Sequence, residues 1–431
     1  MDIMVNTPLL ATPLTEPLHQ LEQHILEQQT EIESWFRRQW RHTPAPIYSS
    51  VDLRNAGFKL APIDTNLFPA GFNNLNPDFM TLCIQAMQST LTQRYPNLEK
   101  ILLIPESHTR NAFYLDNVAI LCDLLECAGF VVKLGSFLSD EQLPLNLTTA
   151  SGRTLTLHAV QQQHNQVQSG NFIPDLIFLN NDLSEAHPAM LDHTPQPIVP
   201  DLRLGWKQRL KSVHFSHYNK VANEFSDLIK IDPWWINPYF RNCGSVDFMQ
   251  GDGLECLHHN ATLLFELIQK KYDEYHIKDK PFIIVKADAG SYGMGVMSIK
   301  SPDELRTLNR KQRSHMAMTK GKVAINKVIL QEGVYTFEKW NNATAEPVVY
   351  MIGDTVVGGF YRVNTQRGDS ENLNAPGMHF QPLAFDESCQ APGHTLCEES
   401  HRRFYVYGVI ARLAALASAH ELQTLLGASH D

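Results

Sequence analysis

Apolar residues recur at mostly helical spacing over residues 15–41, near the start of the chain. The residues on this stripe are Leu18, Leu21, Ile25, Ile32, Phe36 and Trp40. A stripe of this period predicts one amphipathic helix whose charged and glutamine-rich face is solvated. Pro44 and Pro46 end the helical pattern. We therefore expect residues 1–44 to form an N-terminal helix.

Residues 101–134 carry the pattern of a β-α-β unit, in which two apolar strands flank a helix with one apolar stripe. Residues 175–180 predict another short buried strand. The polar residues at its end are Asn180, Asn181 and Asp182. Ligands of open α/β sheets collect at the carboxyl ends of strands. We therefore expect an open α/β domain over residues 45–200.

The second half of the chain mixes strands and helices. The elements that its pattern predicts are a strand at 282–285, a strand at 328–331, a hairpin of 347–352 with 355–362 around Gly353-Asp354, and a closing helix at 402–425. Such a mixture is typical of an α+β domain, which we expect over residues 201–431. The predicted fold class is thus α/β plus α+β.

Composition narrows the range of partners and compartments. The 431 residues carry a net charge of −10, which argues against nucleic acid or an anionic membrane as the main partner. No run of 18 apolar residues is present, and no basic region precedes an apolar stretch at the N-terminus, so neither a transmembrane helix nor a signal peptide is expected. The seven cysteines form no CxxC pair. Free thiols in a reducing, cytoplasmic compartment are the simplest interpretation.

The strongest local chemical pattern is a strand, a lysine and a loop with three glycines over residues 283–296. Lys286 ends the strand, and Gly290, Gly293 and Gly295 follow it. Glycines let backbone N–H groups approach an anion, and the lysine adds a point charge for phosphate. The loop matches neither the P-loop nor the Rossmann fingerprint. A plain hairpin turn is the alternative interpretation.

An apolar strand that runs into an acidic hinge follows at residues 328–334. Such a hinge can offer backbone groups to adenine and the carboxylate of Glu332 to a ribose hydroxyl. A strand end with a surface glutamate is the structural alternative.

Oxygen-bearing side chains then accompany the predicted hairpin. The candidate magnesium ligands are Glu346, Glu371, Asn372 and Asn374. Magnesium takes one or two carboxylates together with phosphate oxygens and water. Arg362 could stabilise charge on a phosphoryl group in transfer. A single glutamate on a hairpin is usually solvated, so it is the order of strand, lysine, loop, hinge and ligands that indicates a site.

This order resembles the ATP-grasp superfamily, in which ATP lies between two α+β subdomains. The strand Ile284-Val285-Lys286 and its glycine loop resemble the lysine and glycine-rich flap of bacterial glutathione synthetase. Asn372, with Gly377 after it, resembles the magnesium-binding asparagine and following glycines of that family. Residues 217–220 resemble its segment with an earlier nucleotide-binding lysine, which would be Lys220.

Over most of residues 45–425 the chain resembles the bacterial glutamate–cysteine ligase family that is built on an ATP-grasp core. Three polar segments carry this resemblance: Asp52-Leu53-Arg54-Asn55, residues 64–74 and His108-Thr109-Arg110-Asn111. We expect residues 64–74 to form a long ordered loop. Two departures concern the glycine loop, which has no adjacent glycines, and Glu346, where an aspartate is common.

The resemblance implies an N-terminal open α/β domain followed by an ATP-grasp fold of two subdomains, with a glycine loop near 287–296. It also implies a ligase that uses ATP and Mg²⁺ to join glutamate to cysteine, the first step of glutathione biosynthesis. The implied catalytic residues are Arg362 and Lys286. The implied ATP-binding residues are Lys220, Lys286, Gly290, Ser291, Tyr292, Gly293, Gln331, Glu332 and Val334.

The polar segments at 52–74 are the expected glutamate site. The candidate residues are Asp52, Arg54, Lys59, Asp64, Asn66, Asn73 and Asn74. Arg54 suits a substrate carboxylate because a guanidinium offers a planar fork of donors, and Asp52 or Asp64 suits the ammonium group. The alternative is that these residues only shape turns.

Two other functions stay open at this point. One is another ATP-grasp carboxylate–amine ligase, such as a glutathione synthetase, and the other is a non-catalytic nucleotide-binding regulator. The expected partners are glutamate, cysteine and ATP, and the pattern does not show whether the chain forms a homo-oligomer.

Overall fold

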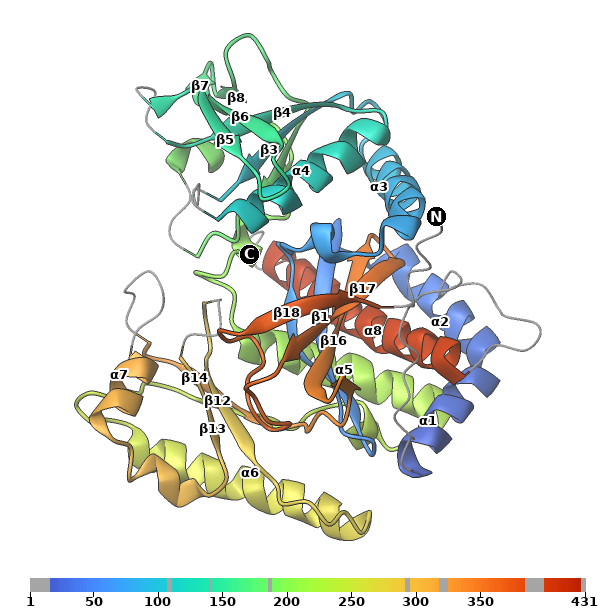
Figure 1. Cartoon of the computed structure of the whole chain (residues 1–431), viewed down its shortest axis with the longest axis vertical. Coiled ribbons are helices and arrows are strands. Elements are labelled where there is room, and N and C mark those ends of the chain that lie inside the picture. Colours follow the sequence, from blue (N-terminus) through green and yellow to red (C-terminus); the bar gives the residue numbers. More distant parts are fainter. Residues whose placement is uncertain are drawn as a thin grey trace.

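The computed structural model describes residues 16–106, 111–138, 142–184, 188–290, 295–317, 325–383 and 399–427. Three main sheets and the helices that cover them follow one another along the longest axis of the molecule (Figure 1). The chain as described is of mixed α/β class, as predicted. None of the described helices is long and apolar enough to cross a membrane.

The central sheet is antiparallel and contains strands from both the N-terminal and the C-terminal parts of the chain. Its strands are β1 (Tyr48–Asn55), β2 (Leu60–Asn66), β15 (Lys339–Trp340), β16 (Ala343–Ile352), β17 (Thr355–Asn364) and β18 (Met378–Pro382). Their order is β18-β17-β16-β1-β2, with β15 beside β16. The predicted hairpin is confirmed as β16 and β17. Residues 64–66, expected in a loop, belong to β2 because they pair with β1. Residues 48–66 thus share a sheet with the C-terminal half.

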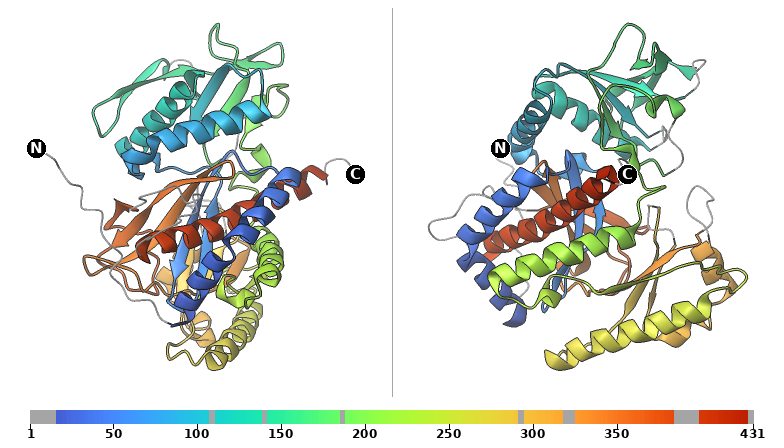
Figure 2. Two further views of the ribbon diagram at one scale, coloured as in Figure 1. Left: turned by 90° about the vertical axis from the view of Figure 1, so that its right-hand side faces the viewer. Right: turned by 180° about the vertical axis from the view of Figure 1, so that it is seen from behind.

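Four helices cover one face of this sheet (Figure 2). They are α1 (Glu16–Glu27), α2 (Gln29–His42), α5 (Lys211–Ile229) and α8 (Glu399–Gly427). The single helix expected over residues 15–41 is therefore two helices, and Gln28 lies between them. The closing helix α8 is confirmed, and its alanine-rich stretch packs with Val51, Leu53 and Val349 in the largest hydrophobic core.

The sheet at one end of the molecule is mostly parallel. Its strands, in spatial order, are β10 (Ile198–Val199), β9 (Leu176–Asn180), β3 (Lys100–Pro105), β4 (Val131–Ser136), β6 (Thr154–Ala159) and β5 (Leu145–Thr148). Only β5 runs antiparallel to its neighbour. The predicted β-α-β unit is confirmed as β3, α4 (Ala112–Cys127) and β4. Helix α3 (Met80–Arg94) and the small hairpin of β7 (Gln161–Gln163) and β8 (Gln166–Gln168) complete this layer.

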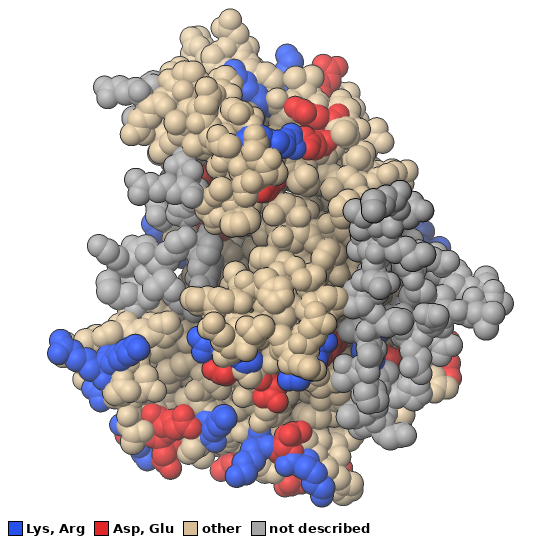
Figure 3. Space-filling view, in the orientation of Figure 1, with Lys and Arg blue, Asp and Glu red and all other residues tan. Residues whose placement is uncertain are grey.

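The sheet at the opposite end is small and antiparallel. Its order is β11 (Phe240–Cys243), β14 (Val328–Glu332), β12 (Ile283–Ala287) and β13 (Val296–Ile299), and α6 (Leu254–Glu274) and α7 (Arg310–Ala317) accompany it. Acidic and basic side chains are interspersed over this end on the face shown in Figure 3. Short 3-10 helices elsewhere are η1 (Phe72–Asn74), η2 (Pro77–Phe79), η4 (Ala189–Leu191), η5 (Leu202–Leu204), η6 (Pro233–Trp235) and η7 (Pro302–Leu305).

Candidate active site

A cavity of about 300 Å³ lies where the three sheets meet. The central sheet lines it with residues of β1, β2, β16, β17 and β18, and the small sheet lines it with residues of β12, β13 and β14. The third contribution comes from Glu106, just after β3, and Asp182, just after β9. Acidic groups therefore stand at the carboxyl ends of parallel strands, where ligands of open α/β sheets bind.

Strand alternation explains why the cavity is charged although the central sheet is a core element. Successive side chains of a strand point to opposite faces. On β1, Val51 and Leu53 pack under the helices, while Ser50, Asp52 and Arg54 line the cavity. One face of the central sheet is therefore hydrophobic core, and the other is the floor of the site.

Two arginines and two carboxylates form a bonded chain across this floor. Arg54 Nε donates to Glu346 Oε2 at 2.8 Å, and Arg362 Nη1 donates to Glu346 Oε1 at 2.7 Å. Arg362 Nη1 also donates to Asp52 Oδ2 at 2.8 Å. Glu346 and Arg362 are directly paired across β16 and β17. The order of alternating charges is thus Arg54, Glu346, Arg362 and Asp52.

The two carboxylates of this chain differ in electrostatics. Burial raises the pKa of Glu346, but Arg54 and Arg362 outweigh it and hold that pKa below its usual range. Asp52 keeps a raised pKa because burial, together with repulsion from Glu346 and Asp64, outweighs its pairing with Arg362. Burial therefore dominates at Asp52, whereas the two arginines dominate at Glu346.

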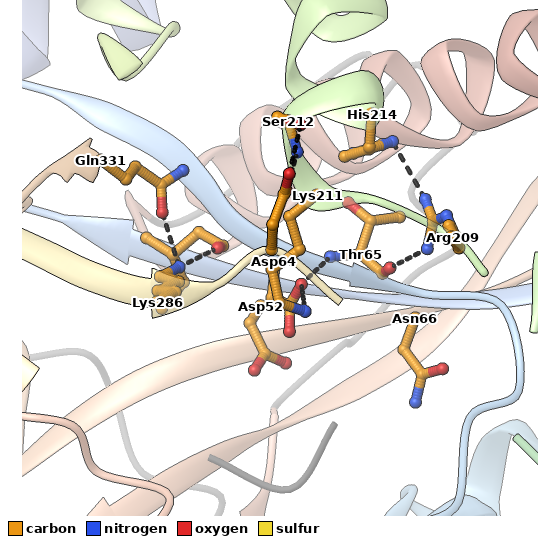
Figure 4. A network of polar contacts seen from close by, with 12 residues as sticks. Asp52, Asp64, Thr65, Asn66, Arg209, Lys211, Ser212, His214, Lys286 and Gln331 are labelled. Carbon is orange, nitrogen blue, oxygen red and sulfur yellow. Dashed lines mark hydrogen bonds and ion pairs between the residues drawn. The ribbon is translucent and has the colours of Figure 1, made fainter. Parts of the chain in front are cut away.

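Lys286 stands at the end of β12, as predicted, and its amine has neutral partners. Its Nζ donates to the carbonyl oxygen of Ile63 at 2.7 Å and to Gln331 Oε1 at 2.6 Å (Figure 4). Burial lowers the pKa of Lys286 to about 8, although Asp64 opposes this shift. No carboxylate neutralises this amine by a direct bond among the described contacts, so it can serve an incoming anion.

The second lysine that lines the cavity is Lys211, whereas the predicted Lys220 lies elsewhere on the same helix. Lys220 is exposed on α5 and is not among the described residues that line the cavity. Lys211, in the first turn of the same helix, is buried, lines the cavity and lies 3.4 Å from Asp64 Oδ1 (Figure 4). Its Nζ also lies 3.7 Å from the centre of the Trp206 ring. We did not identify Lys211 from the sequence, because its contact with Asp64 joins residues 147 positions apart.

The base of the glycine loop is tied to the start of α5. Asp288 accepts hydrogen bonds from the backbone N–H and the hydroxyl of Ser212, at 2.8 and 2.7 Å. Gly290 donates its N–H to the carbonyl of Trp206 and has φ of +96°. Gly290 lines the cavity, whereas the predicted ligands Ser291, Tyr292 and Gly293 lie outside the described residues.

The hinge residues Gln331, Glu332 and Val334 all line the cavity. The carboxylate of Glu332, however, has three partners of its own. It accepts from Lys59 Nζ at 2.8 Å, from Trp234 Nε1 at 3.0 Å and from the N–H of Tyr239 at 2.9 Å. Lys59 is 1 % exposed and is not among the described lining residues. The geometry therefore favours a structural role for both Lys59 and the carboxylate of Glu332, against our expectation.

Arg54 lines the cavity, but protein acceptors take four of its five N–H donors. Besides Glu346, it donates to the carbonyl oxygens of Val334 at 3.2 Å, Asp369 at 3.4 Å and Glu371. The sequence interpretation required a planar fork of two free donors on Arg54 for a substrate carboxylate. Among the described contacts, no such pair of donors is left free. Instead, Arg54 connects the hinge to residues 369–371, which lead into Asn372 and Asn374.

The candidate metal ligands separate into two groups. Glu346, Asn372 and Asn374 line the cavity, whereas the side chain of Glu371 faces Arg367 and the N–H of Gly368 at its exposed rim. Asn364, which we did not predict, is fully buried and donates to the carbonyls of Leu373 and Ala375 at 3.3 Å each. Carboxylate and amide oxygens fit magnesium chemistry.

The remaining glutamate-site candidates are divided as well. Asp64 and Asn66 of β2 line the cavity, and Lys211, Lys286 and Arg209 hold the pKa of Asp64 below its usual range despite burial. Asn73 and Asn74 lie in η1 and are half-buried, and neither is among the described lining residues. Other lining residues that sequence reasoning missed are Ser50, Phe68, Ala70, Trp206, Tyr350, Phe360, Met378 and Phe380.

Arg209 is a further residue without a sequence signal. It is buried, donates to Glu421 of α8 and to the carbonyl of Thr65, and contacts His214 of α5 (Figure 4). It thereby holds the end of β2, which carries Asp64 and Asn66, against two helices. Its partners are up to 212 residues away in sequence, and such distances hide the role from local patterns.

The layered fold and the charged cavity are those of an enzyme that binds small polar molecules. The family model of glutamate-cysteine ligase matches residues 22–422. The chain belongs to the glutamate–cysteine ligase family. The predicted family and the predicted enzyme activity, ligation of glutamate to cysteine, are confirmed by this membership, and the glutathione synthetase and regulator alternatives are set aside.

Three solved structures are similar to this chain to different degrees. A 1.90 Å crystal structure from Methylobacillus flagellatus KT, of a protein named as a candidate γ-glutamylcysteine synthetase, shares 51 % identity at a TM-score of 0.88 and covers 97 % of this chain and 99 % of that chain. D-alanyl-alanine synthetase A from Vibrio cholerae has 12 % identity, a TM-score of 0.33 and coverage of 73 % and 81 %. A glutathione synthetase-like effector from Globodera pallida has 10 % identity, a TM-score of 0.38 and coverage of 86 % and 83 %. No curated protein matches this chain.

Proposed function

We propose that the chain uses ATP and Mg²⁺ to activate the γ-carboxylate of glutamate as an acyl phosphate, which the amine of cysteine then attacks. The products are γ-glutamylcysteine, ADP and phosphate, and we place this first step of glutathione biosynthesis in the cytoplasm. The observation that carries the proposal is the cavity itself, which brings three cations, Lys286, Lys211 and Arg362, together with the carboxylates of Asp52, Asp64 and Glu346. Phosphoryl transfer needs such positioning and charge neutralisation more than covalent help.

ATP would lie against the small sheet. The apolar side chains of Ile284, Ala287 and Val296 line this part of the cavity, next to the hinge at Gln331–Val334. An apolar wall beside backbone donors and acceptors suits a purine base. The phosphates would extend toward Lys286 and Lys211, whose amines lie at the inner end of that wall.

The magnesium site would lie on the charged floor. Glu346, Asn372 and Asn374 would hold the ion, and Asp52 is a further oxygen donor at the same end of the cavity. When bound, Mg²⁺ neutralises charge on phosphate oxygens. Arg54 would act on this site indirectly, because it orients Glu346 and the backbone that leads to the two asparagines.

Arg362 is the group proposed to neutralise the reacting centre. Burial lowers the pKa of Arg362, but Asp52 and Glu346, which hold it on both sides, outweigh burial and raise that pKa above its usual range. A fixed cation in a site shielded from water stabilises the charge that develops on the acyl phosphate and on the tetrahedral oxyanion.

The amino-acid end of the site would lie toward the parallel sheet. From Arg54 to Ser50 the floor extends by four residues, or about 13 Å at the usual strand rise. Along this distance the charged side chains of the floor are followed by Ser50, Tyr350 and Phe360. Glu106 and Asp182 line the same cavity. We assign Glu106 and Asp182 to the α-ammonium group of glutamate, in place of Asp52 or Asp64, which the sequence interpretation gave for this group.

The amine specificity tests the proposal. Purified protein is given ATP, Mg²⁺ and glutamate, together with cysteine, serine, glycine or 2-aminobutyrate, and ADP release and product mass are measured. We expect kcat/KM to be highest with cysteine and the product mass to be that of γ-glutamylcysteine. ADP release without an amide product, or equal turnover of γ-glutamylcysteine as an acceptor of glycine, would refute it.

A further inference from the structure

Two cysteines far from the cavity floor have their sulfur atoms in contact. Cys243 is the last residue of β11 and is 4 % exposed, whereas Cys256 lies in the first turn of α6 and is exposed. Their Sγ atoms are 3.5 Å apart. A disulfide bond requires an approach to about 2.05 Å, which a small side-chain rotation at the exposed cysteine can supply.

The backbone between the two cysteines builds this proximity. Asp247 donates its N–H to the carbonyl of Asp252, and Gly251 donates to the carbonyl of Asp247, at 2.9 and 2.8 Å. Gly253 has φ of +78°, and a Cβ atom at this position would lie 2.3 Å from the carbonyl oxygen of Ser245. Glycine is therefore required where the loop returns to α6. The turn brings the start of the helix back to the end of the strand.

Side chains hold the same arrangement from the helix side. Asn260, one turn after Cys256, donates to the Sγ and to the carbonyl oxygen of Cys256 at 3.5 and 3.0 Å. Its Oδ1 lies 3.5 Å from Nη1 of Arg241. Arg241 and Cys243 are alternate residues of β11 and point to the same face. The two thiols are thus juxtaposed by both elements.

We propose that Cys243 and Cys256 form a reversible dithiol–disulfide site that takes small-molecule disulfides, such as cystine, as its oxidant. The proposal does not rest on the proposed ligase reaction. Intracellular disulfides are rare and are usually transient or redox-sensing. A preformed thiol contact with one exposed member suits such a role.

The chemistry is a pair of thiol–disulfide exchanges. The Cys256 thiolate attacks one sulfur of cystine, the S–S bond of cystine breaks, and one cysteine leaves as a thiolate that takes up a proton. Cys243 then loses its proton and attacks Cys256 Sγ, which releases the second cysteine and forms the protein disulfide. Burial raises the pKa of Cys243 to about 11, so the exposed Cys256 is the residue that reacts first.

The disulfide would join α6 covalently to the sheet that carries Lys286. Strand β11 pairs with β14, and β14 pairs with β12. The oxidant is the disulfide form of cysteine, the amine that the family uses. The site would therefore make this part of the protein sensitive to the oxidation state of the cysteine pool.

Peptide mapping of the native full chain tests the proposal. The protein is equilibrated with cysteine and cystine at several ratios, free thiols are alkylated, and the chain is cut after Glu255, which lies between the two cysteines. We expect the two resulting peptides to stay linked by a disulfide in a fraction that rises with the cystine ratio and returns to zero with dithiothreitol. Full alkylation of both residues in excess cystine would overturn the proposal.

Two variants make the test specific. In Cys243→Ser the second exchange is blocked, so Cys256 should retain a half-cystine adduct, and an unmodified Cys256 would contradict the assigned order of attack. Cys127→Ser is the matched control, because Cys127 is also exposed. This variant should form the Cys243–Cys256 link as the unchanged protein does, and loss of the link in it would assign the oxidation to another pair.

Discussion

Lys59 and Lys286 are two buried lysines whose pKa is lowered by burial to about 8, and the sequence predicts both as ligand contacts. Their surroundings differ. Lys59 lies against Glu332, with its Nζ 4.3 Å from the Trp234 ring centre, and is matched inside the protein. Lys286 lines the cavity and has a carbonyl and an amide oxygen as partners. A lysine that lines a cavity and has no carboxylate partner indicates anion binding, whereas a buried lysine paired with a carboxylate indicates a structural role.

The largest expected effect concerns Lys59. Lys59→Met leaves the carboxylate of Glu332 buried without its cation, and breaking a buried pair costs about 3–5 kcal/mol of unfolding free energy. Urea unfolding measures this loss, while kcat of the folded protein should stay near normal. In the control Lys59→Met/Glu332→Gln no buried charge is left unpaired, so the loss should be smaller. A stable Lys59→Met variant with a raised KM for ATP would place Lys59 in the site.

Lys286→Ala should have the opposite profile. The lost charge serves phosphate in the ground state and in the transition state, so kcat/KM for ATP should fall by the equivalent of about 2–4 kcal/mol. Unfolding free energy should change little, because no carboxylate is left unpaired by a direct bond. Steady-state kinetics and urea unfolding on the same preparation separate the two effects. An unchanged kcat/KM would remove Lys286 from the nucleotide site.

Arg54→Ala sharpens the comparison for a cation that lines the cavity but whose donors are mostly taken by the protein. The variant loses the support of Glu346 and of the backbone before Asn372, and loss of such supporting contacts typically weakens a metal site about 10–100-fold. The Mg²⁺ concentration for half-maximal activity should rise accordingly, and Arg54→Lys should restore it only in part. Normal Mg²⁺ activation with a higher KM for glutamate alone would return Arg54 to the substrate.

The pH dependence of nucleotide binding follows from the pKa of Lys286. Bound phosphates favour the charged amine, so they raise its pKa above the value of about 8 in the free protein. Affinity for ADP is therefore complete below pH 8 and falls as pH rises above it, by at most about tenfold per pH unit. Calorimetry between pH 7 and 9.5 measures this. Lys286→Arg should flatten the profile, and an identical slope in that variant would show that another group titrates.

The smallest expected effect is at the predicted lysine that the structure places on the surface. Lys220→Ala should change kcat/KM for ATP by less than about twofold, within the usual range for an exposed residue. Lys211→Ala on the same helix should lower it by tenfold or more, as expected for a close charge contact. Similar losses in both variants would mean that α5 contributes through stability alone.

Sequence patterns predicted the elements that depend on local periodicity. The β3-α4-β4 unit, the β16–β17 hairpin, α8 and the lysine at the end of β12 are where the pattern placed them. Local patterns did not predict the pairing of β1 with β16, because the paired residues are about 300 positions apart and their contact is set by tertiary packing. The split at Gln28 also has no clear signal in the apolar spacing.

The candidate site shows the same limit. The sequence identifies residue types. Lys286, Glu346, Arg362 and Asp52, which it predicts as site residues, line one cavity. The sequence cannot show which charges the protein itself neutralises. Arg54 donates hydrogen bonds to carbonyl oxygens of residues 280 and more positions away in the sequence, and Lys59 is paired with the carboxylate of Glu332. Lys211 was missed because its role depends on a helix start beside Trp206 and Asp64.

A crystal structure with a non-hydrolysable ATP analogue, Mg²⁺ and glutamate tests the central claim most directly. The account predicts phosphate oxygens within about 3 Å of Nζ of Lys286 and of Lys211, a usual charge-assisted distance, and a cation at Glu346 with an asparagine oxygen of Asn372 or Asn374. Lys59 should keep its contact with Glu332 and touch no ligand. Phosphates bound at Lys59 or Lys220, or an analogue outside this cavity, would contradict the account.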